Sequence, residues 1–393
     1  MRRNGDRAAV EAARATTPPV AIFTNSMVMG GMEEHVLQLG RGLRERGFPV
    51  TVICSSDDAI APLRDGLHEA DVEVRALSAK QASLGSALPR VRELAAALRP
   101  FRGGVLHIHM TGHRGGALTM LAARLAGVRA IVRSVHLPPT GRVGRQDRVL
   151  VGITDRQLAR IVCVSSETRR AHVDALGRDP RKCVVVHNGV DLERFSPDVP
   201  PIDLRAEFGI APTAPVVGTV ARLGETRKGM HHFVDAAALI AARAPDTRFL
   251  VVGDGELRTA LESRARERGL GERVVFAGQR ADVPRVLTAL SVFVSPSIYE
   301  ACQYNLLEAM AAGRAVVSTL TGVAPEVIVD GVTGRAVAIG DPHALAVATL
   351  ETLAAPAEAA RMGARARERI LSGFSLDAML DGLVRVYREV VSG

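Results

Sequence analysis

Short runs of apolar, often β-branched residues alternate along the chain with longer segments in which apolar positions recur at helical spacing. Within the short runs apolar residues are nearly continuous, which is typical of parallel strands buried on both faces. The pattern therefore predicts an α/β protein with two series of parallel strands covered by helices. The expected strands are PVAIFTN, VTVIC, VEVRAL, VLHIHM, AIVRSVH, RIVCVS and CVVVHNGV, and then PVVGTVARL, RFLVVGDG, VVFAG, VFVSPS and AVVSTLTG.

A proline-rich stretch, SPDVPPIDLRAEFGIAPTAP, separates the two series. Crowded prolines sustain neither a central strand nor an uninterrupted helix, so we place the domain boundary there. The last residues have apolar positions at helical spacing and predict a terminal helix that packs back onto the first domain. We expect a disordered tail over 1–18, a first domain over 19–197 joined by a helix at 375–391, a linker over 198–214, and a second domain over 215–374.

The amino-acid composition is that of a globular protein without a transmembrane helix. An apolar fraction of 47% and charged residues at 23%, spread along the chain, are ordinary for a globular protein. No stretch of about 18 uncharged apolar residues occurs, so no transmembrane helix is expected. The four cysteines are far apart in sequence, which suits a reducing cytoplasm better than a disulfide framework or a zinc site.

The net charge of +8 suits a polyanionic ligand, a nucleotide or an anionic membrane surface. Only 3% of residues are aromatic and none is Trp, so the stacking surfaces of a single-strand nucleic-acid binder are missing and no nucleic-acid partner is expected. Peripheral contact with the inner face of a membrane stays open, as does a homodimer.

Two glycines mark the end of the first predicted strand. Gly30 and Gly31 precede a helical segment, and backbone without side chains can approach an anion closely while helix amides point at it. The motif is neither a P-loop nor a dinucleotide fingerprint, because no Lys-Ser pair and no spaced glycines follow. A bare turn is the alternative.

Two cations follow the first strand of the second series, in ARLGETRKGM. Arg222 and Lys228 could converge on one pyrophosphate and offset the charge of a departing diphosphate. The alternative is a pair of solvated surface cations. Lysine occurs only at Lys80, Lys182 and Lys228 in this arginine-rich chain, which favours a function for Lys228.

Two carboxylates lie eight positions apart in PSIYEACQYNLLEAMAAG. Glu300 follows a strand and Glu308 lies on the next helix, so they could accept hydrogen bonds from sugar hydroxyls and from a ribose diol. Glu308 could equally belong to the solvated side of an amphipathic helix.

These segments together resemble the family 4 glycosyltransferases. GGMEEH, SVH, HNGVD, ARL with RKG, VGDGELR and the E-x7-E element occur in the family's order, from about Pro19 to Val391. The resemblance implies the GT-B fold, with two Rossmann-like doubly wound parallel-sheet domains facing a cleft, and retention of anomeric configuration.

Site residues are implied by the same resemblance. Gly30 and Gly31 would hold the donor diphosphate from the first domain, and Arg222 and Lys228 from the second. Glu300 would bind the transferred sugar and Glu308 the ribose. The remaining implied positions are His136 near the reaction centre, Asn188 near the cleft, and Gly253, Gln303, Tyr304 and Asn305 on the donor side, where Cys302 and Gln303 replace the family's frequent Phe-Gly pair.

Histidines suggest a further feature of the first domain. His107, His109 and His113 form H-x-H-x3-H, and His107 and His109 would share one face of a strand. The spacing allows a metal site, but we favour His109 as a wall of the acceptor site and expect no metal, because no Asp-x-Asp occurs. The arginines of TGRVGRQDRVL form either a solvated loop or a binding site for a phosphorylated acceptor or anionic lipid.

The predicted function is that of a metal-independent retaining glycosyltransferase. It would move a hexosyl or N-acetylhexosaminyl unit from a nucleotide sugar, expected to be UDP-linked, to an acceptor hydroxyl and form an α-glycosidic bond. The acceptor is a small polyol or cyclitol, a natural product, or a lipid-linked sugar. The alternatives are a nucleotide-sugar epimerase and a non-catalytic sugar-nucleotide-binding protein.

Overall fold

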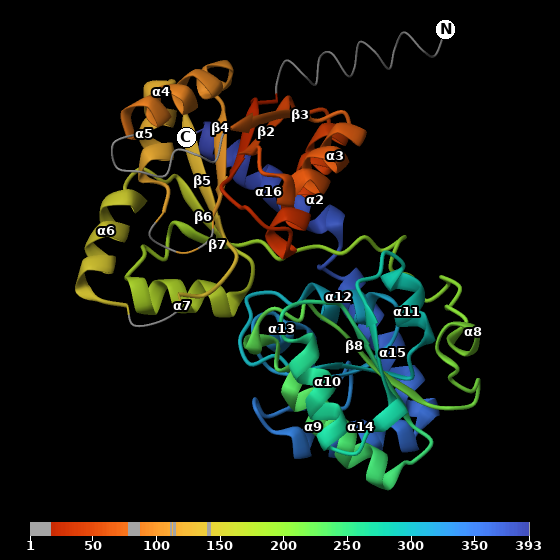
Figure 1. The fold of residues 1–393 in the computed structure, drawn as a ribbon. Coiled ribbons are helices and arrows are strands. Elements are labelled where there is room, and N and C mark those ends of the chain that lie inside the picture. Colours follow the sequence, from red (N-terminus) through yellow and green to blue (C-terminus); the bar gives the residue numbers. More distant parts are fainter. Residues whose placement is uncertain (1–16, 78–86, 111, 113–114, 140–142, 393) are drawn as a thin grey trace, which may run out of the picture. The chain divides into compact units, whose positions relative to one another are not determined.

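The computed structural model describes residues 17–77, 87–110, 112, 115–139 and 143–392. Most of the tail expected over 1–18 lies outside these ranges, as does His113. The chain forms two compact units, unit 1 (Met1–Asn188 with Asp377–Gly393) and unit 2 (Gly189–Leu376) (Figure 1). None of the described helices is long and apolar enough to cross a membrane.

Unit 1 is built on a seven-stranded parallel sheet in the order β3-β2-β1-β4-β5-β6-β7. Its strands are β1 (Val20–Thr24), β2 (Val50–Ser55), β3 (Glu73–Leu77), β4 (Val105–His109), β5 (Ala130–Val135), β6 (Arg160–Cys163) and β7 (Cys183–Val185). Its helices are α2 (Gly31–Glu45), α3 (Ala61–Glu69), α4 (Ala87–Leu98), α5 (Ala117–Leu125), α6 (Arg145–Asp155), α7 (Ser166–Leu176) and α16 (Leu376–Ser392), with short 3-10 turns at Asp58–Ile60 and Arg99–Phe101.

Helices cover both faces of the unit 1 sheet. On one face, Leu106 and Ile108 of β4 pack with Leu94 of α4 and Met120 of α5 in one buried apolar cluster. On the other face lie α2 and α16, which approach each other closely because Gly42 of α2 has no side chain. A Cβ at Gly42 would come within 2.3 Å of the Leu380 side chain on α16.

Unit 2 is built on a six-stranded parallel sheet in the order β10-β9-β8-β11-β12-β13. Its strands are β8 (Val216–Val220), β9 (Arg248–Val252), β10 (Val274–Gly278), β11 (Val292–Ser295), β12 (Ala315–Thr319) and β13 (Arg335–Val337). Its helices are α8 (Leu204–Phe208), α9 (Met230–Arg243), α10 (Arg258–Glu267), α11 (Val283–Ala289), α12 (Tyr304–Ala311), α13 (Ala324–Val327), α14 (Pro342–Ala354) and α15 (Pro356–Leu371), with 3-10 turns η4 (Thr226–Lys228) and η5 (Gly271–Arg273).

Both sheets reverse their strand order once. In unit 1 the reversal lies between β1 and β4, and in unit 2 between β8 and β11. Ligands of open parallel sheets bind beyond the carboxyl ends of the strands at such a reversal. The residues that follow these four strands are therefore the first place to look for a site.

The fold class and the twelve expected strands are confirmed, and two details differ. β13 was not expected, and it is a three-residue strand at the sheet edge. The arginines of the TGRVGRQDRVL segment were predicted to lie in a solvated loop or in a binding site, and the loop is wrong from Arg145 onward, where α6 begins. The side chain of Asp147 accepts a hydrogen bond from the Gly144 amide at 2.8 Å. This cap stabilises the start of the helix, because it satisfies one free amide.

Candidate functional site

A buried carboxylate lies at the strand reversal of unit 2. Glu300 follows β11 and is only 3% exposed. Its Oε1 accepts a hydrogen bond from Lys228 Nζ at 2.5 Å, and its Oε2 accepts one from Arg227 Nη1 at 2.6 Å. The predicted residues Lys228 and Glu300 therefore meet. A buried charge requires such pairing, because leaving it unpaired would cost several kcal/mol.

Arg227 is a site residue that sequence reasoning missed. Its guanidinium bridges Glu300 and Glu225, and Glu225 also pairs with Arg222. Burial acts to lower the pKa of Arg227, but the two carboxylates raise it above its ordinary value, so the side chain stays cationic. The signal for this residue was its place beside Lys228 in the RKG motif. Two carboxylates thus hold three cations at the end of β8.

The backbone at Gly229 explains why a glycine follows Lys228. Gly229 ends η4 with φ of +66°, and a Cβ there would lie 1.9 Å from the carbonyl oxygen of Pro296. A side chain is excluded, because both the left-handed conformation and the contact demand glycine. The close approach brings the loop after β8 against the loop after β11, which positions Lys228 next to Glu300.

Gly253 supports the neighbouring loop. It follows β9 with φ of +125°, and a Cβ there would lie 1.9 Å from the carbonyl oxygen of Ala221. The amide of Leu223 donates to the carbonyl of Asp254 at 2.8 Å. These contacts place Arg222 beyond the end of β8, where the sequence predicted it.

The other donor-side candidates lie at the start of α12. Asn305 Nδ2 donates to the carbonyl of Val220 at 2.6 Å, which ties α12 to the end of β8. Gln303 is 1% exposed and donates from Nε2 to Thr321 Oγ1 at 3.0 Å. Both side chains therefore brace the loop. Tyr304 and Glu308 lie on α12 itself and are half-buried.

In unit 1 the glycine turn begins α2 at the strand reversal. Gly30 is the N-cap residue and Gly31 the first helical residue, so the free amides of the 15-residue helix follow directly. Helix N-termini favour anions because their amides and dipole are positive. Glu33 and Glu34 also lie in this first turn and are stabilised by the same field.

Histidine side chains gather beside this turn. His109 ends β4, His136 follows β5, and His35 lies on α2 one turn after Gly31. Ring centroids of these three residues lie 5.0 to 5.3 Å apart, and His109 Nδ1 and His136 Nε2 share a hydrogen bond of 2.9 Å. The Asn188 side chain lies close enough to act on His35 and opposes the lowering of its pKa by burial. Two predicted residues, His109 and His136, therefore meet, and His35 is one that sequence reasoning missed.

Burial keeps these imidazoles neutral. It lowers the pKa of His35 to about 4 and lowers the pKa values of His107, His109 and His136 well below the ordinary value, with repulsion among the rings adding to the effect. His107 Nδ1 and the Tyr387 hydroxyl lie 2.6 Å apart, and its Nε2 lies 2.8 Å from Ser134 Oγ. Neutral rings offer one donor and one acceptor each, so the cluster can orient a hydroxyl without adding charge.

The histidines that could hold a metal differ from those suggested by H-x-H-x3-H. His107 is engaged with Tyr387 and Ser134. In the described ranges, His35, His109 and His136 form the group of three potential metal ligands whose ligand atoms all lie within 4.8 Å of one another. Three imidazoles suit zinc or a similar ion. The hydrogen bond between His109 and His136 occupies two of these nitrogens.

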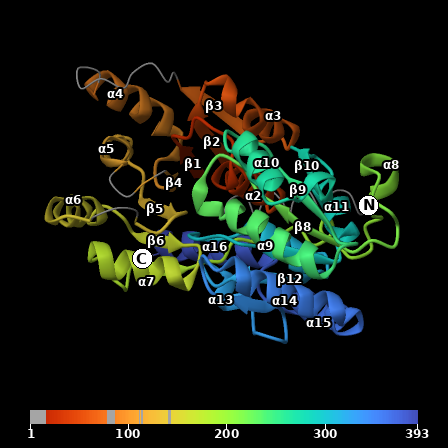
Figure 2. The same cartoon turned by 60° about the horizontal axis from the view of Figure 1, so that its bottom comes forward.

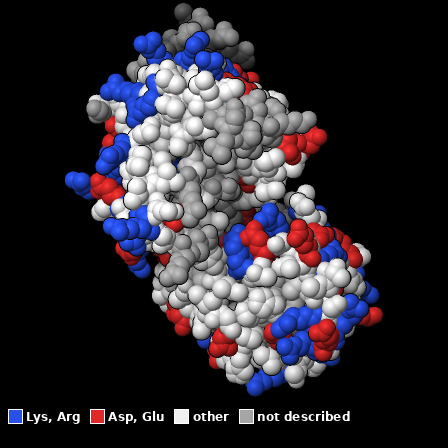
Figure 3. Space-filling model, turned by 60° about the vertical axis from the view of Figure 1, so that its left-hand side comes forward, with Lys and Arg blue, Asp and Glu red and all other residues white. Residues whose placement is uncertain are grey.

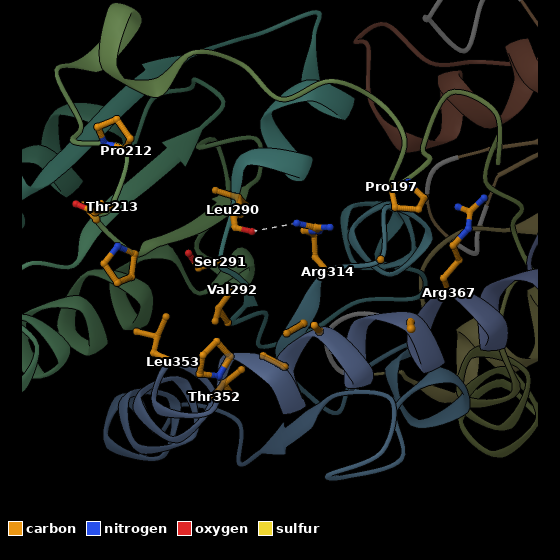
Figure 4. A pocket seen from close by; sticks show the side chains of 18 of the residues that line it. Pro197, Pro212, Thr213, Leu290, Ser291, Val292, Arg314, Thr352, Leu353 and Arg367 are labelled. Carbon is orange, nitrogen blue, oxygen red and sulfur yellow. Dashed lines mark hydrogen bonds between the residues drawn. The ribbon is translucent and has the colours of Figure 1, made fainter.

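A separate cavity of about 830 Å³ opens in unit 2 (Figure 4). Pro215, Ser291 and Arg314 line it, and each directly precedes a strand or lies at its start. The cavity therefore lies at the amino ends of β8, β11 and β12, whereas Lys228 and Glu300 lie beyond the carboxyl ends. We assign it no part in donor binding.

Comparison with known proteins identifies the family of the chain. A family model described as "Glycosyltransferase Family 4" matches residues 29–194, and one described as "Glycosyl transferases group 1" matches residues 214–355. A solved structure of Anabaena Alr3699/HepE in complex with UDP superposes with a TM-score of 0.82 at 23% identity, covering 94% of this chain and 100% of that one. It shares the fold.

Three characterised relatives are similar over most of the chain. The UDP-Gal:alpha-D-GlcNAc-diphosphoundecaprenol alpha-1,3-galactosyltransferase of Escherichia coli is 30% identical over 75% of this chain and 78% of its own. The phosphatidyl-myo-inositol mannosyltransferase of Mycolicibacterium smegmatis is 31% identical over 93% and 92%. The 2-deoxystreptamine glucosyltransferase of Streptomyces kanamyceticus is 31% identical over 72% and 80%.

Proposed function

Because the chain belongs to glycosyltransferase family 4, a family of retaining hexosyltransferases that use nucleotide sugars, we propose that it transfers a hexosyl or N-acetylhexosaminyl unit from a UDP-linked donor. The product is an α-glycoside of an acceptor hydroxyl. UDP is favoured because one relative is named for a UDP-galactose donor and one structural neighbour holds UDP.

The observation that carries this proposal is the clamp of Arg227 and Lys228 on the buried Glu300. When a donor binds, its diphosphate forms ion pairs with Arg227 and Lys228, and Glu300 accepts hydrogen bonds from the sugar hydroxyls. Charge that develops on the leaving diphosphate is then offset by groups already in place, which is the largest common source of catalysis. Arg222 adds a third cation and Glu308 binds the ribose.

In unit 1 we assign the diphosphate to the amides that follow Gly30 and Gly31. His136 lies near the transferred sugar, and His109 and Asn188 face the acceptor side. The reaction needs no protein nucleophile, because the leaving diphosphate oxygen can take the acceptor's proton on the face that it departs from. The chain's contribution is orientation and charge stabilisation. No metal is required, because the cations and helix amides replace it.

The acceptor that we favour is lipid-linked. Two of the three relatives are named for diphosphoundecaprenol-linked and phosphatidylinositol acceptors, and the third is named for the cyclitol 2-deoxystreptamine. A soluble cyclitol is therefore the second candidate. The arginines and exposed apolar residues described in the next subsection favour the lipid.

The test is a panel of UDP-, GDP- and ADP-sugars, with nucleotide release measured with and without lipid-linked and cyclitol acceptors and products identified by mass spectrometry. We expect UDP release to rise at least about tenfold with the correct acceptor. Conversion of a UDP-sugar to its epimer without acceptor would assign the chain to the epimerases. Binding of UDP without release under any condition would assign it a non-catalytic role.

A further inference from the structure

We infer that the exposed sides of α5 and α6 form a docking surface for an anionic lipid bilayer. The inference deepens the proposed function, on which it relies for a lipid-linked acceptor. Its physical basis is independent of the reaction and lies wholly within unit 1.

Both helices expose large aliphatic side chains. Leu118, Leu121 and Leu125 of α5 are 39%, 47% and 68% exposed. Their spacing of three and four positions places them in one stripe along the helix. On α6, Val149, Leu150 and Ile153 are 59%, 38% and 55% exposed and also span about one turn. We call these six residues the aliphatic ridge.

The two helices are neighbours. Arg124 Nη2, near the end of α5, donates to the carbonyl of Gln157, two residues beyond α6, at 2.8 Å. Both helices lie on the same side of β4, β5 and β6 in two views (Figures 1 and 2). The two stripes therefore lie on the same face of unit 1, and each holds three exposed aliphatic residues, whereas exposed apolar residues that occur singly are normal on a protein surface.

The exposed charges of the two helices themselves are positive. The exposed charged residues of α5 and α6 are Arg124, Arg145 and Arg148, and all are arginine. The acidic residues of α6, Asp147 and Asp155, are buried. On the side that carries α4, α5 and α6, many blue atoms and a few red ones border a white area of this unit (Figure 3). The surface is therefore complementary to anionic headgroups.

The chemistry of the ridge favours a bilayer over a protein partner. Protein interfaces are enriched in aromatic residues at their centres, whereas the ridge consists of Leu, Val and Ile alone. Aliphatic residues flanked by arginine on helices that lie along a surface are typical of interfacial membrane binding. Arginine stems can also lie along the acyl boundary while their guanidinium groups reach the headgroups.

The position of the ridge fits a lipid-linked acceptor. The chain reaches α5 from β4, which ends at His109, and reaches α6 from β5, which His136 follows. The amino ends of both helices therefore lie at the edge of the sheet that carries the histidine cluster. A lipid held along these helices would present its headgroup at that edge.

The test is co-sedimentation of the full chain with vesicles. We expect binding to phosphatidylglycerol–phosphatidylcholine vesicles and none to phosphatidylcholine alone, with loss of affinity as salt is raised. The double variant Leu121→Glu/Ile153→Glu should abolish binding. Arg145→Gln/Arg148→Gln should weaken it about 30-fold, since each arginine near an anionic surface contributes roughly a factor of five.

Matched variants serve as controls. Leu239→Glu alters a residue of unit 2 whose exposed fraction, 41%, is similar to the 47% of Leu121. Arg243→Gln/Arg266→Gln removes two exposed arginines of unit 2. These variants should bind vesicles like the unaltered chain. Thermal unfolding and UDP-sugar hydrolysis should be unchanged in all four, which separates loss of the surface from loss of the fold.

Three results would overturn the inference. The first is that the chain does not bind anionic vesicles. The second is that the unit 2 control variants lose as much vesicle binding as the ridge variants. The third is that Leu121→Glu/Ile153→Glu dissociates a dimer, which would make the ridge a contact between copies. If the chain transfers sugar but does not bind vesicles, only the inference of a docking surface is refuted. If the chain binds vesicles but transfers no sugar, only the proposed function is refuted.

Discussion

Glu300 is held by two side chains from one loop, and its carboxylate is almost completely removed from solvent. Such a group is costly unless a ligand or a partner uses it. Arg227 and Lys228 already neutralise it, so in the proposed function an incoming diphosphate would meet cations that are held in place. This arrangement requires little reorganisation during the reaction.

Lys228→Ala and Glu300→Gln should each lower kcat/KM for sugar transfer about 100- to 1,000-fold, because each removes a group that the proposed function places against the departing diphosphate or the sugar. Steady-state kinetics with the identified donor measures this. Lys182→Ala provides a lysine control away from the site, since Lys182 Nζ donates to the carbonyls of Asp155 and Leu158 in unit 1. Full activity in both site variants would remove the basis of the assignment.

The buried histidines make the stability of unit 1 dependent on pH. Their folded pKa values lie below the ordinary 6.5, so below pH 6.5 the unfolded state binds more protons and stability falls. The loss extends down to the folded pKa, which is about 4 for His35, and for this residue it is on the order of 3 kcal/mol.

Circular dichroism melting between about pH 4.5 and pH 7.5 measures this effect. His35→Gln should flatten the acid side of the profile, whereas His68→Gln, which alters an exposed histidine of α3, should leave it unchanged. An identical slope in both variants would contradict neutral burial of His35.

Residues that sequence reasoning missed share one property. His35 and Arg227 lie within the very motifs that were singled out, GGMEEH and RKG. Helical periodicity places His35 one turn after Gly31, on the same side, and could have identified it. Its partners His109 and His136 are about 70 and 100 positions away, so only the folded sheet reveals the cluster.

At the scale of elements, the loop after β8 depends on one glycine. Gly229→Ala should destabilise unit 2 by about 3 kcal/mol or more, because left-handed backbone costs an alanine about 1 to 2 kcal/mol and the Cβ meets the Pro296 carbonyl. Gly209→Ala is the control, since Gly209 has φ of +65° and open space around its Cβ position. It should cost only about 1 kcal/mol. Urea unfolding distinguishes the two, and equal losses would refute the contact.

Strands were predictable where β-branched and apolar residues form a run. VTVIC and VFVSPS are rich in such residues, and every one of the twelve runs contains a strand. β13 begins with an arginine and all three of its residues are partly exposed, so it has no such run, whereas the equally short β7 lies within CVVVHNGV. α6 was missed because its first turn is arginine-rich, and its cap came from an aspartate three residues beyond a glycine.

At the scale of the whole molecule, α16 joins the last residues to unit 1. Tyr387 is fully buried against His107, and Leu380 lies against Gly42. The boundary expected at 198–214 stays a prediction, while the contacts divide the chain at Asn188 and again at Leu376.

Removal of residues 377–393 should therefore unfold unit 1, because it exposes a buried apolar face and leaves His107 without its tyrosine. Limited proteolysis and calorimetry would show loss of one transition. Tyr387→Phe is the milder control and should cost about 1 kcal/mol, the value of one hydrogen bond. A truncated chain that melts like the intact one would show that α16 is dispensable.

Metal removal tests the chemistry of the assembled enzyme. Turnover should survive dialysis against EDTA, because in the proposed function arginine, lysine and helix amides would supply the positive charge at the diphosphate. Transfer assays, together with metal analysis by mass spectrometry, measure this. Loss of activity that zinc restores in the unaltered chain, but not in His35→Ala, would assign an ion to the histidine cluster.

Local sequence by itself determined the strands, the glycine turns, the α/β class and the motifs of a family 4 glycosyltransferase, because these depend on residues that are neighbours along the chain. Tertiary structure alone decided which side chains meet. The clamp on Glu300 joins residues 72 and 73 positions apart, and the His107–Tyr387 pair spans 280. Such partners are chosen by strand order and helix packing, which bring distant segments together without leaving a periodic signal in either one.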